Sequence, residues 1–370
     1  MQNSIRVPSL FACGSAAAAP RFLFLLCLPL LAVQTHGCCP YAETRYQGPP
    51  SDHFDGEAFF NPWGIEQHDL KDLFRFIATR NPAEWEPSEA SAAAGVGRFP
   101  ERIGPGELSV TFVNHSTVLV QMDGFNVLTD PVWSERIGPG TALDLRRKRL
   151  PGVPFEDLPP IDLVLISHNH YDHMDLPTLK RLYQAHRPEF FVGLGDAHRL
   201  HQRGIGPARE LDWWQRRTTR GGLEVVGVPA QHFSNRGLCD RNRSLWLGYV
   251  LRSSAGNVYF AGDTGWAPHF EQIGRRLAPI RLALLPIGAS EPRWFMQPVH
   301  TDAYDAVRAH RKLGALISVA IHHGTFQQGD DGELQPVALL AAAIRAAGEP
   351  VPRFWVLENG ESRRVPLPPK

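Results

Sequence analysis

A dense group of potential metal ligands lies within residues 166–175, which read ISHNHYDHMD. In this segment His168, His170, Asp172 and His173 form the pattern H-x-H-x-D-H. Residues two apart in an extended chain point to the same side, so His168 and His170 can present their imidazoles to one ion. Asp172 and His173 follow on the bend and can reach a second ion beside the first. Imidazole with carboxylate suits divalent zinc, with manganese or iron as alternatives.

Four apolar stretches that are predicted to be strands each lead into a potential ligand. LVLI precedes Ser167-His168, VVGVPAQ precedes His232, VYFAG precedes Asp263 and SVAI precedes His322. Strand ends gathered at one edge of a sheet are where layered α/β enzymes build their sites. One histidine after a strand is more often a hydrogen-bonded structural residue, but a shared placement of four residues favours a site. The residues alone do not decide between His322 and the histidine that follows it.

The elements that would position these ligands alternate along the chain. Asp123-Gly124 predicts a hairpin turn between the second and third strands. Strands interleaved with helices after the initial hairpins predict a mixed α/β layered fold. The predicted strands are 108–113, 116–122, 125–130, 161–166, 189–194, 223–230, 245–251, 257–261, 280–287 and 315–321. The predicted helices are 176–186, 267–277, 302–313 and 336–347.

Composition excludes several classes of protein. Hydrophobic residues make up 43% and charged residues 21% of the 370 residues, as in an ordinary globular protein. A wholly disordered chain, a collagen and a long coiled coil are therefore excluded. The 38 basic and 38 acidic residues give zero net charge, so no general basic field would attract nucleic acid.

The first 38 residues have the features of an export signal. No acidic residue precedes Glu43, and residues 22–33 are an apolar run of twelve. Such a run is too short to span a bilayer comfortably and suits a signal-peptide core. The small residue before Cys38 resembles a bacterial lipoprotein processing site, although Thr35 stands where leucine is usual. We expect a periplasmic protein or one anchored to a membrane by its signal or by lipid. An uncleaved anchor and an incorrectly assigned start are the alternatives.

Residues 39–104 are expected to be an N-terminal extension of one main domain at 105–370, with a helical stretch at 68–80. His53 and Asp55 either face the site or belong to a loop that only packs against the domain, and the second reading is the simpler. Cys239 would stand alone once the other cysteines are removed or lipidated. No disulfide framework is then predicted, and Cys239 would be a small packed residue.

The motifs together resemble those of metallo-β-lactamase-fold hydrolases. They are most similar to the N-acylphosphatidylethanolamine-hydrolysing phospholipase D family and its bacterial relatives. The similar segments are 113–136, 165–175, 229–237, 260–266 and 320–326. The resemblance implies an α/β fold, an αβ/βα four-layer sandwich, with two zinc ions or other divalent metals. The implied ligands are His168, His170 and His232 for one ion, Asp172, His173 and His322 for the other, and Asp263 bridging both.

Further residues are placed near the site by the same resemblance. His300 matches a histidine that lines the site in the family, although it also reads as a surface histidine at a helix start. Asn114 and His115 belong to a segment near the site in the family, with turn formation as the alternative. His323 stands where the family has tryptophan, which puts the neighbouring packing in doubt.

The resemblance implies a zinc phosphodiesterase that cleaves a phospholipid with a metal-bridged hydroxide. Asp172 and His300 are the expected catalytic residues, and Asp172 is expected to transfer the proton as a general acid or base. A lactone or other ester hydrolase is the alternative enzyme, and a lipid-anchored binding protein with little turnover is a third reading. The expected partners are a phospholipid or other small-molecule ester and a membrane surface; the oligomeric state is open. Four aromatic residues either line an acyl groove or belong to the core: Trp213, Trp214, Trp266 and Phe270.

Overall fold

Two seven-stranded sheets form the centre of the protein. The computed structural model describes residues 46–65, 68–86, 100–140, 144–237, 239–348, 350 and 352–368. The first sheet runs in the order β16 (Ser362–Arg364), β1 (Leu108–Asn114), β2 (Thr117–Met122), β3 (Phe125–Thr129), β6 (Leu163–Leu165), β7 (Glu189–Gly193) and β8 (Ala208–Leu211). The second runs β15 (Phe354–Trp355), β14 (Ile317–Ile321), β13 (Ile280–Pro286), β12 (Asn257–Phe260), β11 (Gly248–Arg252), β10 (Glu224–Val228) and β9 (Arg216–Thr218).

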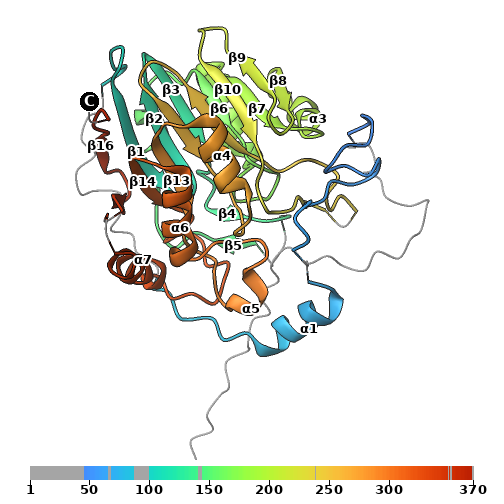
Figure 1. The fold of residues 1–370 in the computed structure, drawn as a ribbon. Coiled ribbons are helices and arrows are strands. Elements are labelled where there is room, and N and C mark those ends of the chain that lie inside the picture. Colours follow the sequence, from blue (N-terminus) through green and yellow to red (C-terminus); the bar gives the residue numbers. More distant parts are fainter. Residues whose placement is uncertain are drawn as a thin grey trace, which may run out of the picture.

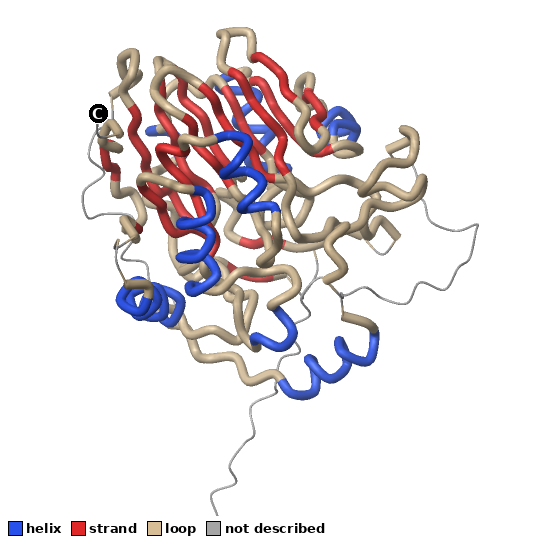
Figure 2. Tube along the Cα trace, viewed as in Figure 1, coloured by secondary structure: helices blue, strands red, loops and turns tan. Residues whose placement is uncertain are grey.

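Helices cover the outer faces of both sheets (Figures 1 and 2). The helices of the described residues are α1 (Leu70–Thr79), α2 (Leu176–His186), α3 (Ala197–Gln202), α4 (His269–Leu277), α5 (Arg293–Met296), α6 (Ala303–Leu313) and α7 (Gln335–Ala346), of which α1 and α5 lie beyond the sheets at one end of the molecule. A 3₁₀ turn, η2 (Phe155–Asp157), and a small sheet of β4 (Arg136–Ile137) and β5 (Leu145–Arg146) lie in the connections.

The central strands are buried on both faces, which explains their nearly continuous apolar sequences. Leu163 and Leu165 of β6 pack into the core between the sheets, whereas Val164 packs among residues of α2 and α3. In β13, Leu284 faces the core between the sheets and Ala283 faces α4 and α6. Side chains that alternate between two buried faces give four layers, helix–sheet–sheet–helix. The predicted αβ/βα sandwich is confirmed.

The predicted elements are present with small shifts at their ends. The turn at Asp123 and Gly124 joins β2 to β3, and both residues have positive φ values of 47° and 83°. That conformation is the one a two-residue hairpin turn of this kind requires. The short helices α3 and α5 and the edge strands β8, β9, β15 and β16 were not predicted. They have two to six residues each, too few to show a hydrophobic period.

The N-terminal residues that carry the predicted export signal lie outside the described part of the chain. Among the described residues, no helix has the length and apolar character needed to cross a membrane. The prediction for Cys239 was wrong: the residue is exposed and disulfide-bonded. Cys239 lies in the connection between β10 and β11. Because this connection is at the surface and not in the packed core, the sulfur of Cys239 is accessible to a second cysteine.

The described part of the extension, residues 46–65 and 68–86, packs against the two-sheet domain. His53 stacks on Trp213 at 4.3 Å between ring centroids, and its Nε2 lies 2.8 Å from a carboxylate oxygen of Asp212. Asp55 accepts hydrogen bonds from the backbone N–H groups of Glu57 and Ala58. Both predicted residues therefore hold the loop in place and do not face the metal cluster described below. The boundary at residue 105 stays a prediction.

Helix α1 is the part of the extension that reaches the functional edge of the sheets. It begins at Asp69, whose carboxylate accepts from two N–H groups of the first turn. Its buried residues Leu73 and Phe76 cluster with Met296 of α5, and the rings of Phe76 and Phe295 stack at 4.2 Å. Figure 1 shows α1 and α5 side by side at one end of the molecule.

Candidate metal centre and its pocket

Three histidines bring ring nitrogens together at the ends of β6 and β10. His168 Nε2 lies 2.8 Å from His170 Nδ1, and His170 Nδ1 lies 3.3 Å from His232 Nε2. All three residues are buried. Nitrogens that converge at these distances can share one ion, because zinc binds imidazole nitrogen at about 2.0–2.1 Å.

A second group of ligand atoms adjoins the first. Asp172 Oδ2 lies 2.9 Å from His173 Nε2 and 3.4 Å from His322 Nε2. Asp263 lies between the two groups: its Oδ2 is 3.1 Å from both His173 Nε2 and His322 Nε2 and 3.9 Å from His232 Nε2. The structure therefore brings all seven predicted ligands together in the predicted two sets of three, with Asp263 joining them.

Unsatisfied atoms in this cluster show that a metal fits it. Within the described part of the chain, His173 Nε2, His322 Nε2 and Asp263 Oδ1 are buried and make no hydrogen bond, although carboxylates lie within ion-pair distance of the two nitrogens. Leaving buried polar atoms unsatisfied is costly. Coordination of a cation satisfies nitrogen and carboxylate atoms at once, so the residues fit a metal cofactor.

Hydrogen bonds behind the cluster fix the orientation of its rings. His173 Nδ1 donates to Asp130 Oδ2 at 2.6 Å. His168 Nδ1 donates to Ser167 Oγ at 2.9 Å, and Ser167 Oγ donates to Asp130 Oδ2 at 2.6 Å. His232 Nδ1 donates to a backbone carbonyl at 2.8 Å. Such bonds hold the opposite ring nitrogens available to a metal.

Asp130 was not predicted to be a site residue. It follows an apolar strand in the same way as the predicted ligands, and that placement was the signal that could have found it. Asp130, His115 and His322 all have positive φ values, 34°, 48° and 59°. Residues other than glycine rarely adopt this conformation, and it gathers at functional sites. The chain thus turns sharply where β3, β1 and β14 end, and these turns aim the three side chains at the cluster.

The charged groups of the cluster stabilise one another. Burial opposes ionisation of Asp172 and Asp263, but the charge of His173 outweighs it and holds the pKa of both carboxyls well below the usual range. Burial also opposes protonation of His322, yet the charges of Asp263 and Asp172 raise its pKa to about 9. Both carboxylates are therefore ionised at neutral pH, the form that binds a cation.

Asp172 receives two further contacts from outside the predicted set. His115 Nε2 lies 2.9 Å from Asp172 Oδ2, so His115 reaches the site instead of only forming a turn. Gln328 Nε2 donates to the same oxygen at 2.8 Å. Nothing in the sequence pattern singled out Gln328, because it lies in an irregular segment between β14 and α7.

The remaining predicted histidines fall on either side of the cluster. His300 is buried beside it, with Nδ1 4.0 Å from Asp263 Oδ2, so it is not a surface residue. Burial lowers the pKa of His300 to about 3, which keeps the ring neutral. His323 stacks on Phe112 at 5.4 Å and 6°, away from the ligands. The structure thus selects His322 over His323, whose imidazole packs against Phe112.

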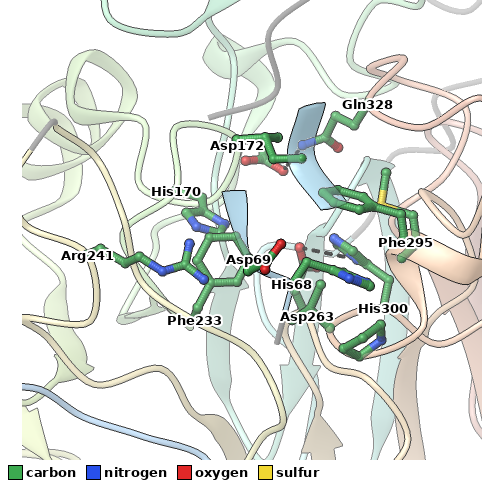
Figure 3. A pocket seen from close by; sticks show the side chains of 14 residues that line it. His68, Asp69, His170, Asp172, Phe233, Arg241, Asp263, Phe295, His300 and Gln328 are labelled. Atoms are coloured by element: carbon green, nitrogen blue, oxygen red, sulfur yellow. Dashed lines mark hydrogen bonds and ion pairs between the residues drawn. The ribbon is translucent and has the colours of Figure 1, made fainter. Parts of the chain in front are cut away.

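A pocket of about 120 Å³ opens onto this cluster (Figure 3). His170, Asp172, Asp263 and His300 line its inner end. Its apolar lining comes from Leu73, Phe233, Phe295, Met296, Pro298 and Val299. The other lining residues are polar: His68, Asp69, Arg241 and Gln328. A concave pocket that combines an apolar wall with polar groups converging at its inner end is typical of a small-molecule site.

The four aromatic residues pack with the core, the second of the two readings. Trp213, Trp214, Trp266 and Phe270 do not line the pocket. Trp213 is buried under His53, and Trp266, which is half-buried, stacks on buried Phe270 at 5.4 Å. The apolar wall of the pocket comes instead from α1, from α5 with the residues after it, and from Phe233.

The seating of α1 gives a testable expectation. Phe76→Ala should loosen α1 from α5, because truncating a buried phenylalanine costs about 3 kcal/mol or more. Limited proteolysis should then cut the extension faster than in the unchanged protein. Phe74→Ala is the matched control, since Phe74 lies on the same helix but is 66% exposed. Equal rates of cutting in the two variants would contradict this account of α1.

Comparisons with known proteins agree with the geometry. The family model for the beta-lactamase superfamily domain matches residues 125–323, more than half of the chain. The chain belongs to the beta-lactamase superfamily. This superfamily member is 38% identical over 294 residues to N-acyl-phosphatidylethanolamine-hydrolyzing phospholipase D 1 of Caenorhabditis elegans, covering 75% of this chain and 82% of the relative. It is 41% identical over 268 residues to an uncharacterized protein of Mycobacterium tuberculosis, covering 70% and 71%.

Solved structures show the same fold at low identity. An isothiocyanate hydrolase from Delia radicum gut bacteria matches with a TM-score of 0.56 and 23% identity, covering 69% of this chain and 98% of the other. A possible metal-dependent hydrolase from Veillonella parvula matches with a TM-score of 0.57 and 17% identity, covering 70% and 99%. The family, the fold and the cluster of potential ligands all support the same conclusion: this superfamily member is a hydrolase with a metal cofactor.

Proposed function

We propose that the protein is a dinuclear zinc phosphodiesterase that cleaves a phospholipid as N-acylphosphatidylethanolamine phospholipase D does. The observation that carries the proposal is the pair of ligand groups joined by Asp263 at the inner end of an apolar pocket. The similarity to the Caenorhabditis elegans phospholipase supports the choice of substrate class.

In this proposal each zinc ion would have its own three ligands. His168, His170 and His232 would hold one ion, Asp172, His173 and His322 would hold the other, and Asp263 would be shared by both. When bound, the two ions lower the pKa of water and neutralise the charge that develops on the phosphate.

The protein residues orient the substrate and handle protons. Asp172 is ionised, and the N–H groups of His115 and Gln328 hold its Oδ2 in place, so it is suited to accept a proton. His300 is neutral, lines the pocket, and within the described residues its Nδ1 makes no hydrogen bond. We assign it a hydrogen bond to the leaving alcohol. The apolar wall excludes water and holds an acyl chain.

We also propose an exported protein that works at a membrane surface. The disulfide at Cys239 supports export, because disulfides persist in oxidising compartments. The membrane surface is supported by the similarity to the Caenorhabditis elegans phospholipase.

Product analysis tests the proposal. The zinc-loaded protein is incubated with N-acylphosphatidylethanolamine, and the products are identified by mass spectrometry beside those of Asp263→Ala. We expect phosphatidic acid and N-acylethanolamine in equal amounts, and neither with the variant. Release of free fatty acid, or turnover of a lactone without any phosphodiester cleavage, would replace the proposal with an ester hydrolase on the same cluster.

A further inference from the structure

The side chain of Gln328 connects the metal cluster to the pocket. Its Nε2 donates to Asp172 Oδ2 at 2.8 Å. A carboxylate oxygen can only accept, so the amide nitrogen must face Asp172 and the amide oxygen must face elsewhere. Figure 3 shows the nitrogen turned towards Asp172 and the oxygen turned away from it. This oxygen, Oε1, is buried and has no hydrogen-bond partner among the described residues.

The backbone that carries Gln328 is anchored on both sides. The neighbouring Gln327 donates through its Nε2 to the carbonyl of Ala83 in the extension. Two residues further on, Asp330 forms an ion pair with Arg80 at 2.9 Å and accepts from the N–H of Asn81. Oε1 is therefore held in place before any substrate enters, which lowers the entropic cost of binding to it.

The position of Gln328 indicates what its oxygen binds. Its amide nitrogen contacts Asp172 of the metal cluster, and Gln328 lines the same pocket as the apolar residues Phe295 and Met296. A buried acceptor without a partner is costly unless a ligand supplies a donor. The donor must lie between the group that reacts at the metals and an apolar chain. An amide N–H attached to an acyl chain has these neighbours.

We infer that Gln328 is a specificity-determining residue whose Oε1 accepts a hydrogen bond from an N–H group of the substrate, located between the scissile phosphodiester and an acyl chain. This inference rests on the proposed function. Through its Nε2 the same amide positions Asp172, and that effect applies to every substrate. Recognition of the N–H applies only to substrates that carry it.

A pair of substrates separates the two effects. One is N-acylphosphatidylethanolamine; the other is its analogue with an ester oxygen in place of the amide N–H. Release of phosphatidic acid from each gives kcat/KM. The unchanged protein should prefer the amide by roughly tenfold, the value of about one hydrogen bond. Gln328→Met keeps the side-chain length and should lower both rates through Asp172 while bringing their ratio to about one.

Gln335→Met is the matched control, because Gln335 accepts from the N–H of Gly332 at the start of α7 and does not line the pocket. Its ratio should equal that of the unchanged protein. Zinc content is measured in all three proteins. Calorimetry gives a second readout: the unchanged protein should bind N-acylethanolamine more tightly than the glycol monoester, and Gln328→Met should bind both equally.

The outcomes distinguish the inference from the function on which it rests. An unchanged protein that cleaves both lipids at equal kcat/KM overturns the role of Gln328 and leaves the phosphodiesterase intact. A Gln328→Met variant that keeps the preference for the amide does the same. An unchanged protein that releases no phosphatidic acid from either lipid overturns the proposed function, and the inference with it.

Discussion

Asp263→Ala is expected to lose bound metal and at least ~100-fold of the activity together, because metal ions stabilise the transition-state charge by several kcal/mol. Asp263 Oδ2 lies within 3.1 Å of His173 Nε2 and His322 Nε2 and 3.9 Å from His232 Nε2. No other carboxylate in the described residues is in contact with both ligand groups. Without it the two sets of histidines retain no shared anion to balance two dications.

The measurement is metal content by mass spectrometry together with the turnover rate. Asp162→Ala is the control, because Asp162 lies immediately before β6, at the end of the strand opposite to His168, and pairs with Arg102. Its metal content should be unchanged. If Asp263→Ala kept the full metal stoichiometry, the bridging assignment would be wrong even if the activity fell.

Asp130→Asn should weaken metal binding by ~10–100-fold, although Asp130 is not itself a predicted ligand. Its carboxylate accepts from the N–H and hydroxyl of Ser167 at 2.7 and 2.6 Å and from His173 Nδ1 at 2.6 Å. An amide can accept at only one of its two polar atoms, so His173 or Ser167 loses its acceptor. The ring of His173 is then no longer held in the orientation that offers Nε2.

Competition with a chromogenic chelator measures this loss. Asp123→Asn is the matched control: Asp123 also accepts several hydrogen bonds, from the N–H groups of Gly106 and Ala255 and from Ser254 Oγ, but it lies in the β2–β3 turn. It should lower stability without changing zinc affinity. Equal zinc affinity in Asp130→Asn and the unchanged protein would show that His173 needs no such support.

The sequence predicted the ligands because their placement follows from local structure. Each of His168, His232, Asp263 and His322 comes after an apolar strand, and the strands gather their ends at one edge of the sheets. The alternation of strands and helices along the chain also predicted a layered α/β fold, and the resemblance to the family implied its four layers. These features depend on residues close together in the chain.

The pocket could not be predicted in the same way. Its walls come from α1, α5 and the segment with Gln328, which are far apart in sequence and lack a periodic pattern. The aromatic residues proposed for it are packed in the interior because their neighbours are apolar, which the sequence around them does not reveal. The disulfide of Cys239 likewise depends on a contact distant in the chain.

The wall that α1 contributes lies ahead of the part of the chain that the superfamily model matches. That match begins at residue 125, so the metal ligands fall inside the matched portion, whereas His68, Asp69 and Leu73 fall outside it. The features that define the superfamily therefore do not fix this wall, and proteins with the same metal ligands can differ in what they accept. Grafting residues 46–86 between relatives should transfer preference for a substrate without moving a single ligand of the metals.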